Sequence, residues 1–385
     1  MEQNKSSITD VFSRLKEDFE SNRFSWVGDY CDFALGYISF ASILHADSTG
    51  IANPVGQFVI GKTSTGKTEF LQALCRLLPP DRVINLTTAS AKSLIYHCRQ
   101  NPRYLNGKVV FVEELAGIRN EEIQYLLRVL VSKGYAQHTT VLSGAAETIE
   151  IIGKIALQST GLDGDVLRDD TMNRLIIVET DESEEKTKKV LGHIIGRYSG
   201  KSLVGPDHFS EYREFFRGLK SYSVEIPYGH EIEFDSSEFI SRRGAKIFMD
   251  LLSTVALINQ AKRKIEGGRL VSKREDLELL LELTRTQERD VQDKQLGLSR
   301  SQEVIWDAIQ RVPNRERFTY QQVVQTGAKG LDGPNYEIST IKRAIKVFLE
   351  ANLVEAVKGS RPCYFAVLSK QRGNRFGVKE KNVLN

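Results

Sequence analysis

The sequence has few of the residues that mark secreted or membrane proteins. Its four cysteines are scattered and form no Cys-x-x-Cys spacing (positions 31, 75, 98 and 363). This scarcity argues against a disulfide framework and against a zinc site. No apolar run approaches the ~20 residues that a membrane-spanning helix needs, and the first residues do not resemble a signal peptide. We therefore expect a cytoplasmic protein with no membrane partner.

The sequence also has no marked excess of positive or negative charge, because the formal net charge of the 385 residues is only +3. Such a balance does not by itself indicate a nucleic-acid partner, although the basic residues gather toward the C-terminus. The composition is 41% hydrophobic and 27% charged, which is ordinary for a globular protein. The length predicts two or three domains.

The strongest motif matches the phosphate-binding pattern G-x-x-x-x-G-K-[ST]. A short apolar stretch, 56–60, predicts a buried strand before it, and helical spacing over 69–78 predicts a helix after it. A strand that turns through glycines into a helix points backbone N–H groups at one place, which suits a polyphosphate. We expect ATP to be held by Gly61, Lys62, Thr63, Ser64, Thr65, Gly66, Lys67 and Thr68. Lys67 would reach the β- and γ-phosphates and Thr68 would hold Mg2+.

Two carboxylates follow the apolar stretch 108–112, about 45 residues beyond the motif. A buried strand that ends in acids beside the phosphates is typical of the second half of a P-loop ATPase. We assign Glu113 to Mg2+ and Glu114 to the base that polarises the attacking water. A glutamate at the first position is unusual, since this pair is commonly Asp-Glu. The alternative is a strand that merely ends at the solvated surface.

Three further features continue the alternation of strands and helices. Residues 136–151 are predicted to form an inserted β-hairpin, because they alternate around a Ser-Gly turn. The next strand, 154–160, ends in polar residues, of which Ser159 or Thr160 could orient water. Arg174 stands just before the last predicted strand.

At this point the order of parts resembles the AAA+ superfamily, and more closely the helicases of bacterial mobile elements that resemble the minichromosome-maintenance (MCM) proteins. The resemblance covers roughly residues 50–285. It implies an α/β fold with a P-loop AAA+ parallel sheet and a helical lid. Within the lid, a helix start at residues 235–238 and helical spacing predict a helix that runs to about Lys264 and stops at Gly267 and Gly268. The resemblance also implies that Ser159 or Thr160 is a sensor, that Arg174 is an arginine finger acting on a neighbouring subunit, and that Arg242 or Arg243 is a second sensor.

The last part of the chain predicts a separate small domain. Helices at 301–311, 319–326 and 338–351, followed by a strand pair around residues 358–362, resemble a winged helix. Its third helix would face DNA with Lys342, Arg343 and Lys346, and its wing with Lys358 and Arg361. Many winged helices bind proteins instead. The expected domains are an N-terminal helical segment (1–50), an AAA+ core (51–205), a lid (206–290), the winged helix (300–370) and a basic tail (371–385).

Together these features predict an ATP-dependent, MCM-like DNA helicase or translocase that serves replication of a mobile element. We expect ATP and Mg2+ as cofactors, DNA as partner, and a homo-oligomeric, hexameric ring. One alternative is an AAA+ helicase loader or DNA-binding switch that does not unwind DNA, and another is a transcription activator. MCM-like helicases often carry a separate zinc or OB-type collar domain, and the sequence shows no sign of one. The loader therefore remains an alternative.

Overall fold

A computed structural model provides the structure of the chain. It describes residues 8–86 except 25, 91–114, 121–142, 145–162, 174–199, 209–234 and 241–284. Toward the C-terminus it describes 304–306, 308–309, 312, 317–326, 336–350, 354–357 and 364–367. The chain divides into two compact units, and the second comprises Gln287–Gly373. Each unit is described by itself below.

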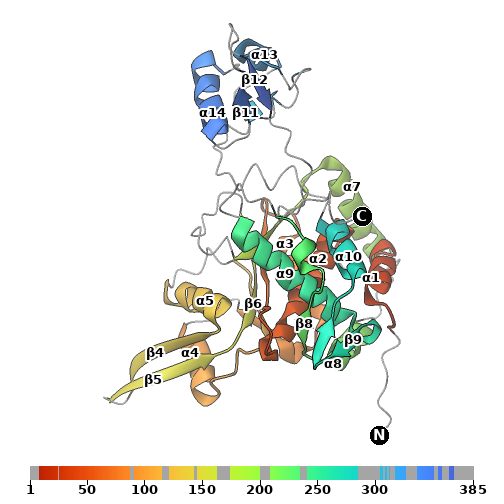
Figure 1. Cartoon of the computed structure of the whole chain (residues 1–385), viewed down its shortest axis with the longest axis vertical. Coiled ribbons are helices and arrows are strands. Elements are labelled where there is room, and N and C mark those ends of the chain that lie inside the picture. The colour runs from red at the N-terminus through yellow and green to blue at the C-terminus, as the bar shows by residue number, and fades with distance from the viewer. Residues whose placement is uncertain are drawn as a thin grey trace. The chain divides into compact units, whose positions relative to one another are not determined.

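The first unit is built on a parallel sheet of five strands in the order β2-β3-β6-β1-β7 (Figure 1). Their bounds are β1 (Gly56–Ile60), β2 (Val83–Leu86), β3 (Lys108–Val112), β6 (Ile155–Gly161) and β7 (Leu175–Glu179). All the pairings are parallel. The α/β class with a parallel sheet is therefore confirmed.

Both faces of this sheet are buried, because neighbouring residues of one strand enter different apolar clusters. Val59, Val109 and Ile176 belong to the larger cluster, whereas Phe58, Val110 and Ile177 belong to the other. A parallel sheet covered on both faces gives strands that are apolar throughout, which explains the uninterrupted runs in the sequence. The flanking helices include α3 (Lys67–Leu77), α4 (Ala91–Gln100) and α5 (Glu121–Lys133), and a short 3-10 helix, η2 (Pro80–Arg82), precedes β2.

The N-terminal residues form helices α1 (Val11–Glu20) and α2 (Tyr30–Ala41), followed by the 3-10 helix η1 (Ser42–Asp47). Asp29 caps α2 by accepting hydrogen bonds from the backbone N–H groups of Cys31 and Asp32. Most of α2 is buried, since it packs against α3 and β1 and also against α9 and α10. This helix therefore joins the sheet to the helices that follow it in the chain.

The predicted insertion is a β-hairpin made of β4 (Tyr135–Leu142) and β5 (Ala145–Ile152). The two strands pair antiparallel over their whole length, from Tyr135 opposite Ile152 to Leu142 opposite Ala145. Figure 1 shows the hairpin extending away from the sheet, with α4 and α5 beside it.

After β7 the first unit continues with α7 (Glu184–Tyr198), α8 (Ser210–Gly218), β8 (Ser223–Glu225) and η3 (Gly229–Glu231). It then forms α9 (Ser241–Ile258), η4 (Gln260–Lys262), β9 (Lys264–Glu266), β10 (Arg269–Val271) and α10 (Arg274–Thr284). Helical spacing in the sequence predicts that α9 continues to about Lys264, and this prediction is wrong. Gly267 and Gly268 have φ values of +56° and +79° and turn β9 back onto β10. No helix among the described residues is both long and apolar enough to cross a membrane.

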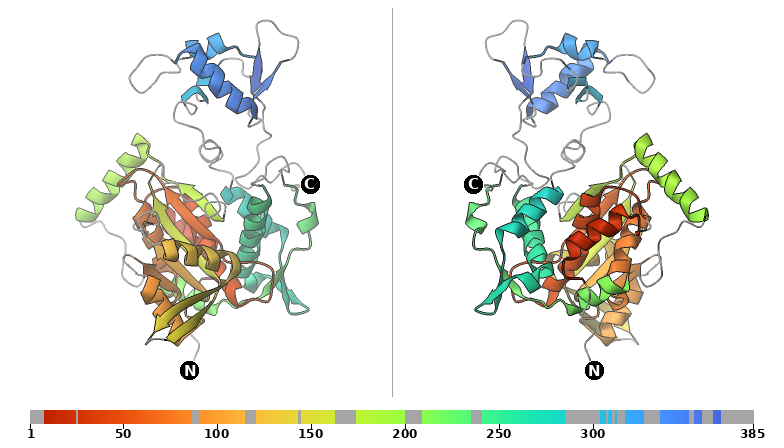
Figure 2. Two further views of the ribbon diagram at one scale, coloured as in Figure 1. Left: turned by 90° about the vertical axis from the view of Figure 1, so that its left-hand side faces the viewer. Right: turned by 90° about the vertical axis from the view of Figure 1, so that its right-hand side faces the viewer.

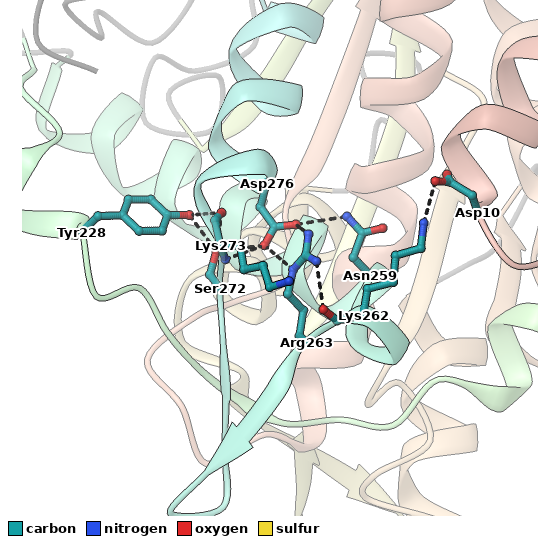
Figure 3. A network of polar contacts seen from close by, with 8 residues as sticks. All are labelled: Asp10, Tyr228, Asn259, Lys262, Arg263, Ser272, Lys273 and Asp276. Carbon is teal, nitrogen blue, oxygen red and sulfur yellow. Dashed lines mark hydrogen bonds and ion pairs between the residues drawn. The ribbon is translucent and has the colours of Figure 1, made fainter. Parts of the chain in front are cut away.

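Asp276 holds this hairpin to α10 through a buried polar network (Figure 3). Its carboxylate is fully buried and accepts from Arg263 Nη2 at 2.5 Å and Nε at 2.9 Å. Asn259, Ser272 and the Lys273 backbone N–H also donate to it, each at 3.0 Å. The paired carboxylate in turn raises the pKa of Arg263.

The described part of the second unit contains α13 (Tyr320–Gln325), α14 (Ile338–Glu350) and the antiparallel pair β11 (Val354–Ala356) and β12 (Phe365–Val367). Residues 304–306 and 308–309 are also helical. Ile341, Ile345 and Phe348 of α14 are buried in a small core of their own. These elements follow the predicted order, and the winged-helix assignment stays a prediction.

Candidate nucleotide-binding site

The P-loop lies between β1 and α3, and its two glycines hold conformations that other residues strain to adopt. Gly66 has φ +85° and forms the N-cap of α3. Gly61 has φ +154°, and a Cβ atom there would collide with the Thr180 hydroxyl. Because Gly66 carries no side chain, no capping group covers the first N–H groups of α3. This end of α3 can therefore accept a phosphate.

Lys67 begins α3 and folds back over the loop. Its ammonium Nζ donates to the carbonyl of Gly61 at 2.8 Å and to that of Lys62 at 2.6 Å. The cation is therefore held within the loop, on neutral carbonyl oxygens rather than on a carboxylate. Such a lysine can exchange these contacts for a phosphate, which offers a full negative charge.

The segment after β7 closes over the start of the P-loop, and the sequence alone did not indicate it. The backbone N–H of Thr180 donates to Ile60 O at 2.9 Å, and its hydroxyl donates to Thr65 Oγ1 at 2.8 Å. Glu182 accepts from the Lys62 backbone N–H at 2.9 Å and from Lys62 Nζ at 2.5 Å. The contacts are possible because β7 lies directly beside β1.

The two carboxylates follow β3, at the same edge of the sheet as the P-loop. Glu113 and Glu114 are both exposed. Only β6 separates β3 from β1, so the two strands lie about 10 Å apart at the usual strand spacing. Glu113 and the P-loop therefore follow strands that are near neighbours at one edge of the sheet. The hydroxyl of Thr160, at the end of β6, donates to the Glu113 carbonyl.

Arg174 lies at the other end of the parallel strands, where β7 begins. It immediately precedes β7, and its guanidinium donates to the Ser132 hydroxyl at the end of α5. The P-loop contacts of β7 begin only after the strand ends, at Thr180. Six residues of extended chain span about 20 Å. An arginine side chain cannot cover that distance, so Arg174 cannot serve the P-loop of its own chain.

The remaining predicted site residues fall into three groups. Ser159 is completely buried in β6, and of the two sensor candidates only Thr160 bonds to the acidic segment. Arg242 and Arg243 are exposed in the first turn of α9, and their sensor role stays a prediction. Lys342, Arg343 and Lys346 are exposed on α14, as predicted for an outward face, whereas Lys358 and Arg361 lie outside the described residues.

An aromatic wall beside the P-loop is a further feature that the sequence analysis missed. Trp26 lies next to Gly66 and packs on Phe70 with ring centroids 4.7 Å apart. Its indole N–H is buried and has no hydrogen-bond partner among the residues that the structure describes. The Lys186 ammonium lies 5.5 Å from the ring, and burial lowers the pKa of Lys186 against the opposing effect of nearby carboxylates such as Asp181.

Trp26 also lines a pocket of about 510 Å3 between the N-terminal segment and α7. The wall of this pocket includes Phe19, Tyr30, Lys189 and His193. Pockets of this size with aromatic walls and a few polar groups suit small organic ligands. The residues that line this pocket include none of the P-loop, and Trp26, which lies next to Gly66, is the residue that connects the two.

A comparison with models of known protein families agrees with this geometry. No curated protein matches the chain. The model of one protein family, described as the MTBMA_p00010 P-loop domain, matches residues 7–220. The matched region covers the N-terminal helices, the whole sheet and the P-loop, and it exceeds half of the chain. The protein therefore belongs to the MTBMA_p00010 P-loop domain family and carries a nucleotide-binding P-loop domain.

Proposed function

We propose that this protein is an ATPase that assembles from several copies and uses ATP hydrolysis to move along or unwind DNA, as the MCM-like helicases of mobile elements do. The observation that carries the proposal is the separation of Arg174 from the P-loop along β7. An arginine that cannot reach its own site fits a finger that completes the site of a neighbouring copy.

The residues of the site suggest how hydrolysis would proceed. The α3 N-terminus and Lys67 would hold the phosphates, and Thr68 with Glu113 would hold Mg2+, which when bound neutralises phosphate charge. Glu114 is exposed at the same edge and would take the proton of the attacking water. The Arg174 guanidinium of the next copy would stabilise negative charge that develops on the γ-phosphate.

The support for a DNA partner comes from the second unit. The exposed cations of α14 (Lys342, Arg343 and Lys346) share one face, and the buried Ile341, Ile345 and Phe348 occupy the other. A helix with this division can contact phosphates and base edges with its cationic side.

One observation favours the alternative of a loader or switch that does not unwind DNA. The β4–β5 hairpin contains no lysine or arginine between residues 135 and 152. Hairpins that follow a DNA strand by contacting its phosphates ordinarily use such cations. In this chain a translocating hairpin would have to depend on hydroxyl groups, His138 and backbone N–H groups.

Strand displacement on a tailed duplex, run beside an ATPase assay, separates the two functions. A helicase displaces the strand with ATP, and Glu114→Gln abolishes both displacement and hydrolysis while it retains ATP binding. ATPase activity that DNA stimulates, without displacement of any tailed duplex, would favour the loader. Normal turnover by Glu114→Gln would contradict the assignment of the base, and Glu113 would then be the first alternative.

A further inference from the structure

We infer that the indole N–H of Trp26 donates a hydrogen bond to the phosphate chain of a bound nucleotide, at the N-terminus of α3. The inference deepens the proposed function and rests on it, because it concerns the same nucleotide site. It assigns phosphate binding to a side chain that lies outside the P-loop motif and well ahead of it in the sequence.

The Trp26 side chain is buried, but its polar atom is left without a partner. The residue is only 8% exposed. Its Nε1 atom is shielded from solvent and has no acceptor in the part of the chain that the structure describes. A donor that loses water on folding and gains no partner destabilises the folded protein. Such a group is rare and calls for a specific explanation, and a ligand that supplies the acceptor is one.

The indole N–H faces the end of α3 that can accept an anion. Trp26 Nε1 lies 3.7 Å, and its ring neighbour Cδ1 3.8 Å, from the place that a Cβ atom of Gly66 would occupy. Gly66 is the N-cap residue of α3 and contributes no capping side chain. The indole N–H therefore lies beside the first backbone N–H groups of the helix, where negative charge is favoured.

Packing around the indole holds it in this orientation. Its six-membered ring lies against Gly28, where a Cβ atom would come within 2.1 Å of Cη2. Phe33 stacks on Trp26 at an interplanar angle of 16°, and the ring centre of Phe70 lies 4.7 Å from that of Trp26. Because these contacts fix the ring before a ligand arrives, the N–H group is preorganised.

The burial of the N-terminal helices brings this residue to the P-loop. Trp26 lies between α1 and α2, which are drawn in red in Figure 2. Helix α2 packs against α3, and Phe33 of α2 and Phe70 of α3 both contact the Trp26 ring. The position of the donor is thus set by the same packing that holds α3 against the rest of the first unit.

The chemistry of the donor and the place where it lies identify phosphate as the acceptor. An indole N–H can donate but cannot accept. The residue that follows Gly66 is Lys67, whose ammonium group is held within the loop on neutral carbonyl oxygens. Phosphates that bind at this helix end would bring charged oxygens to the Trp26 side of Gly66. Hydrogen bonds to charged acceptors are about twice as strong as those between neutral groups.

Competition by inorganic tripolyphosphate tests the inference, because this probe has phosphates but neither base nor sugar. Tripolyphosphate and ATP displace a fluorescent ATP analogue from the full chain, and anisotropy gives the affinity of each. Trp26→Phe keeps an aromatic ring beside Phe33 and Phe70 but removes the N–H. It should weaken the binding of both competitors by about tenfold or more, since a hydrogen bond to a charged acceptor is lost. Trp306→Phe is the matched control, because it removes the other tryptophan, which lies in the second unit.

The indole resonances provide a readout that a purely structural role would not move. The chain has two tryptophans, so labelling with 15N-tryptophan gives two indole 1H–15N signals, and Trp306→Phe assigns them. Tripolyphosphate should shift the Trp26 proton signal downfield, as formation of a hydrogen bond does, and should leave the Trp306 signal in place.

Three results would overturn the inference. Unchanged affinity of Trp26→Phe for tripolyphosphate and ATP would show that the N–H group contacts neither. Weaker binding of ATP alone would place the acceptor on the sugar or the base. Weaker binding of both without a shift of the Trp26 resonance in the wild-type chain would show that the ring acts only by packing.

The proposed function fails on different results. Hydrolysis that does not depend on Glu114 or Arg174 would contradict the proposed mechanism and leave the Trp26 contact intact. Wild-type affinity of Trp26→Phe for tripolyphosphate would remove the contact and leave the ATPase intact. A wild-type chain that binds neither tripolyphosphate nor ATP would remove both.

Discussion

Lys67 is the residue on which nucleotide binding depends most directly. Its ammonium group already faces the loop, at 2.8 Å from Gly61 O and 2.6 Å from Lys62 O. Lys67→Ala should leave the fold intact, since the side chain is half-buried and bonds only to loop carbonyls. It should abolish binding of a fluorescent ATP analogue measured by anisotropy, because the other cation of the loop, Lys62, is paired with Glu182 and leaves Lys67 to neutralise the β- and γ-phosphates. Lys264→Ala, an exposed lysine on β9, is the control.

Normal ATP binding by Lys67→Ala would show that another part of the chain holds the phosphates.

The buried His45 should make the free energy of unfolding depend on pH. Burial lowers the pKa of this histidine to about 3, and Lys154 adds to the effect. Its Nε2 lies 3.1 Å from Thr254 Oγ1, whose hydroxyl donates to Asp250 O, so Nε2 carries the proton of the neutral ring. The unfolded chain binds a proton near pH 6.5 while the folded chain does not. Stability is therefore lost as pH falls below that value.

The loss attributable to His45 should be about 2 kcal/mol between pH 6.5 and pH 5, at 1.36 kcal/mol per pH unit. Urea denaturation at several pH values measures it. His45→Leu should flatten this part of the profile, whereas a substitution of the exposed His230 should not. An unchanged slope in His45→Leu would contradict the prediction.

At the scale of elements, the Asp276 network decides whether β9–β10 stays attached to α10. Arg263 is 6% exposed and pairs with a carboxylate that is fully buried. Asp276→Asn leaves that guanidinium without its counter-charge, and loss of one partner of a buried pair costs about 3–5 kcal/mol. Lys262→Ala, which breaks the exposed pair with Asp10 at 2.6 Å, should cost under about 1 kcal/mol.

Urea denaturation followed by Trp26 fluorescence measures both variants in a Trp306→Phe background, since the chain has only two tryptophans. Equal losses in the two variants would show that the buried network is no stronger than a surface ion pair.

The prediction for DNA binding concerns the exposed cations of helix α14. Replacing Lys342, Arg343 and Lys346 together by alanine should weaken duplex binding at every sequence, because phosphate contacts supply sequence-independent affinity. The slope of log affinity against log salt should fall by about 0.9 for each phosphate that the helix no longer neutralises. Anisotropy at several salt concentrations measures the slope. Alanine at Lys264 and Arg269, exposed cations of the first unit, is the control. An unchanged slope would remove α14 from the interface.

At the scale of the whole molecule, assembly should be required for hydrolysis. Arg174→Ala retains its own P-loop, and Lys67→Ala retains its own arginine, so neither alone should turn over appreciably. Their mixture should recover part of the activity, because some contacts then pair an intact P-loop with an intact Arg174. An arginine supplied across a subunit boundary contributes about 10^3–10^5 in rate in related enzymes. Steady-state ATPase assays of each variant and the mixture measure this.

Wild-type activity in Arg174→Ala alone would show that each chain hydrolyses ATP without its neighbour.

The local parts of the site could be predicted from the sequence, because each depends on residues close together in the chain. Gly61, Gly66 and Lys67 lie within one loop, and the carboxylates of Glu113 and Glu114 directly follow an apolar run. Strand and helix periodicity then gave the order of elements around them. The same local reasoning predicted too long an α9, since Gly267 and Gly268 indicate a break but do not say that a hairpin forms there.

The contacts between segments that are distant in the chain were decided by the tertiary structure alone. Glu182 and Lys62 are 120 residues apart, and they meet because β7 pairs with β1 rather than with β6. Trp26 reaches Gly66 because α2 is buried against α3. No periodicity records which strands become neighbours, since that choice depends on how all the apolar faces are buried together. The sequence by itself therefore determined the P-loop and the position of the two carboxylates after β3, and the packing of the strands and helices decided what surrounds them.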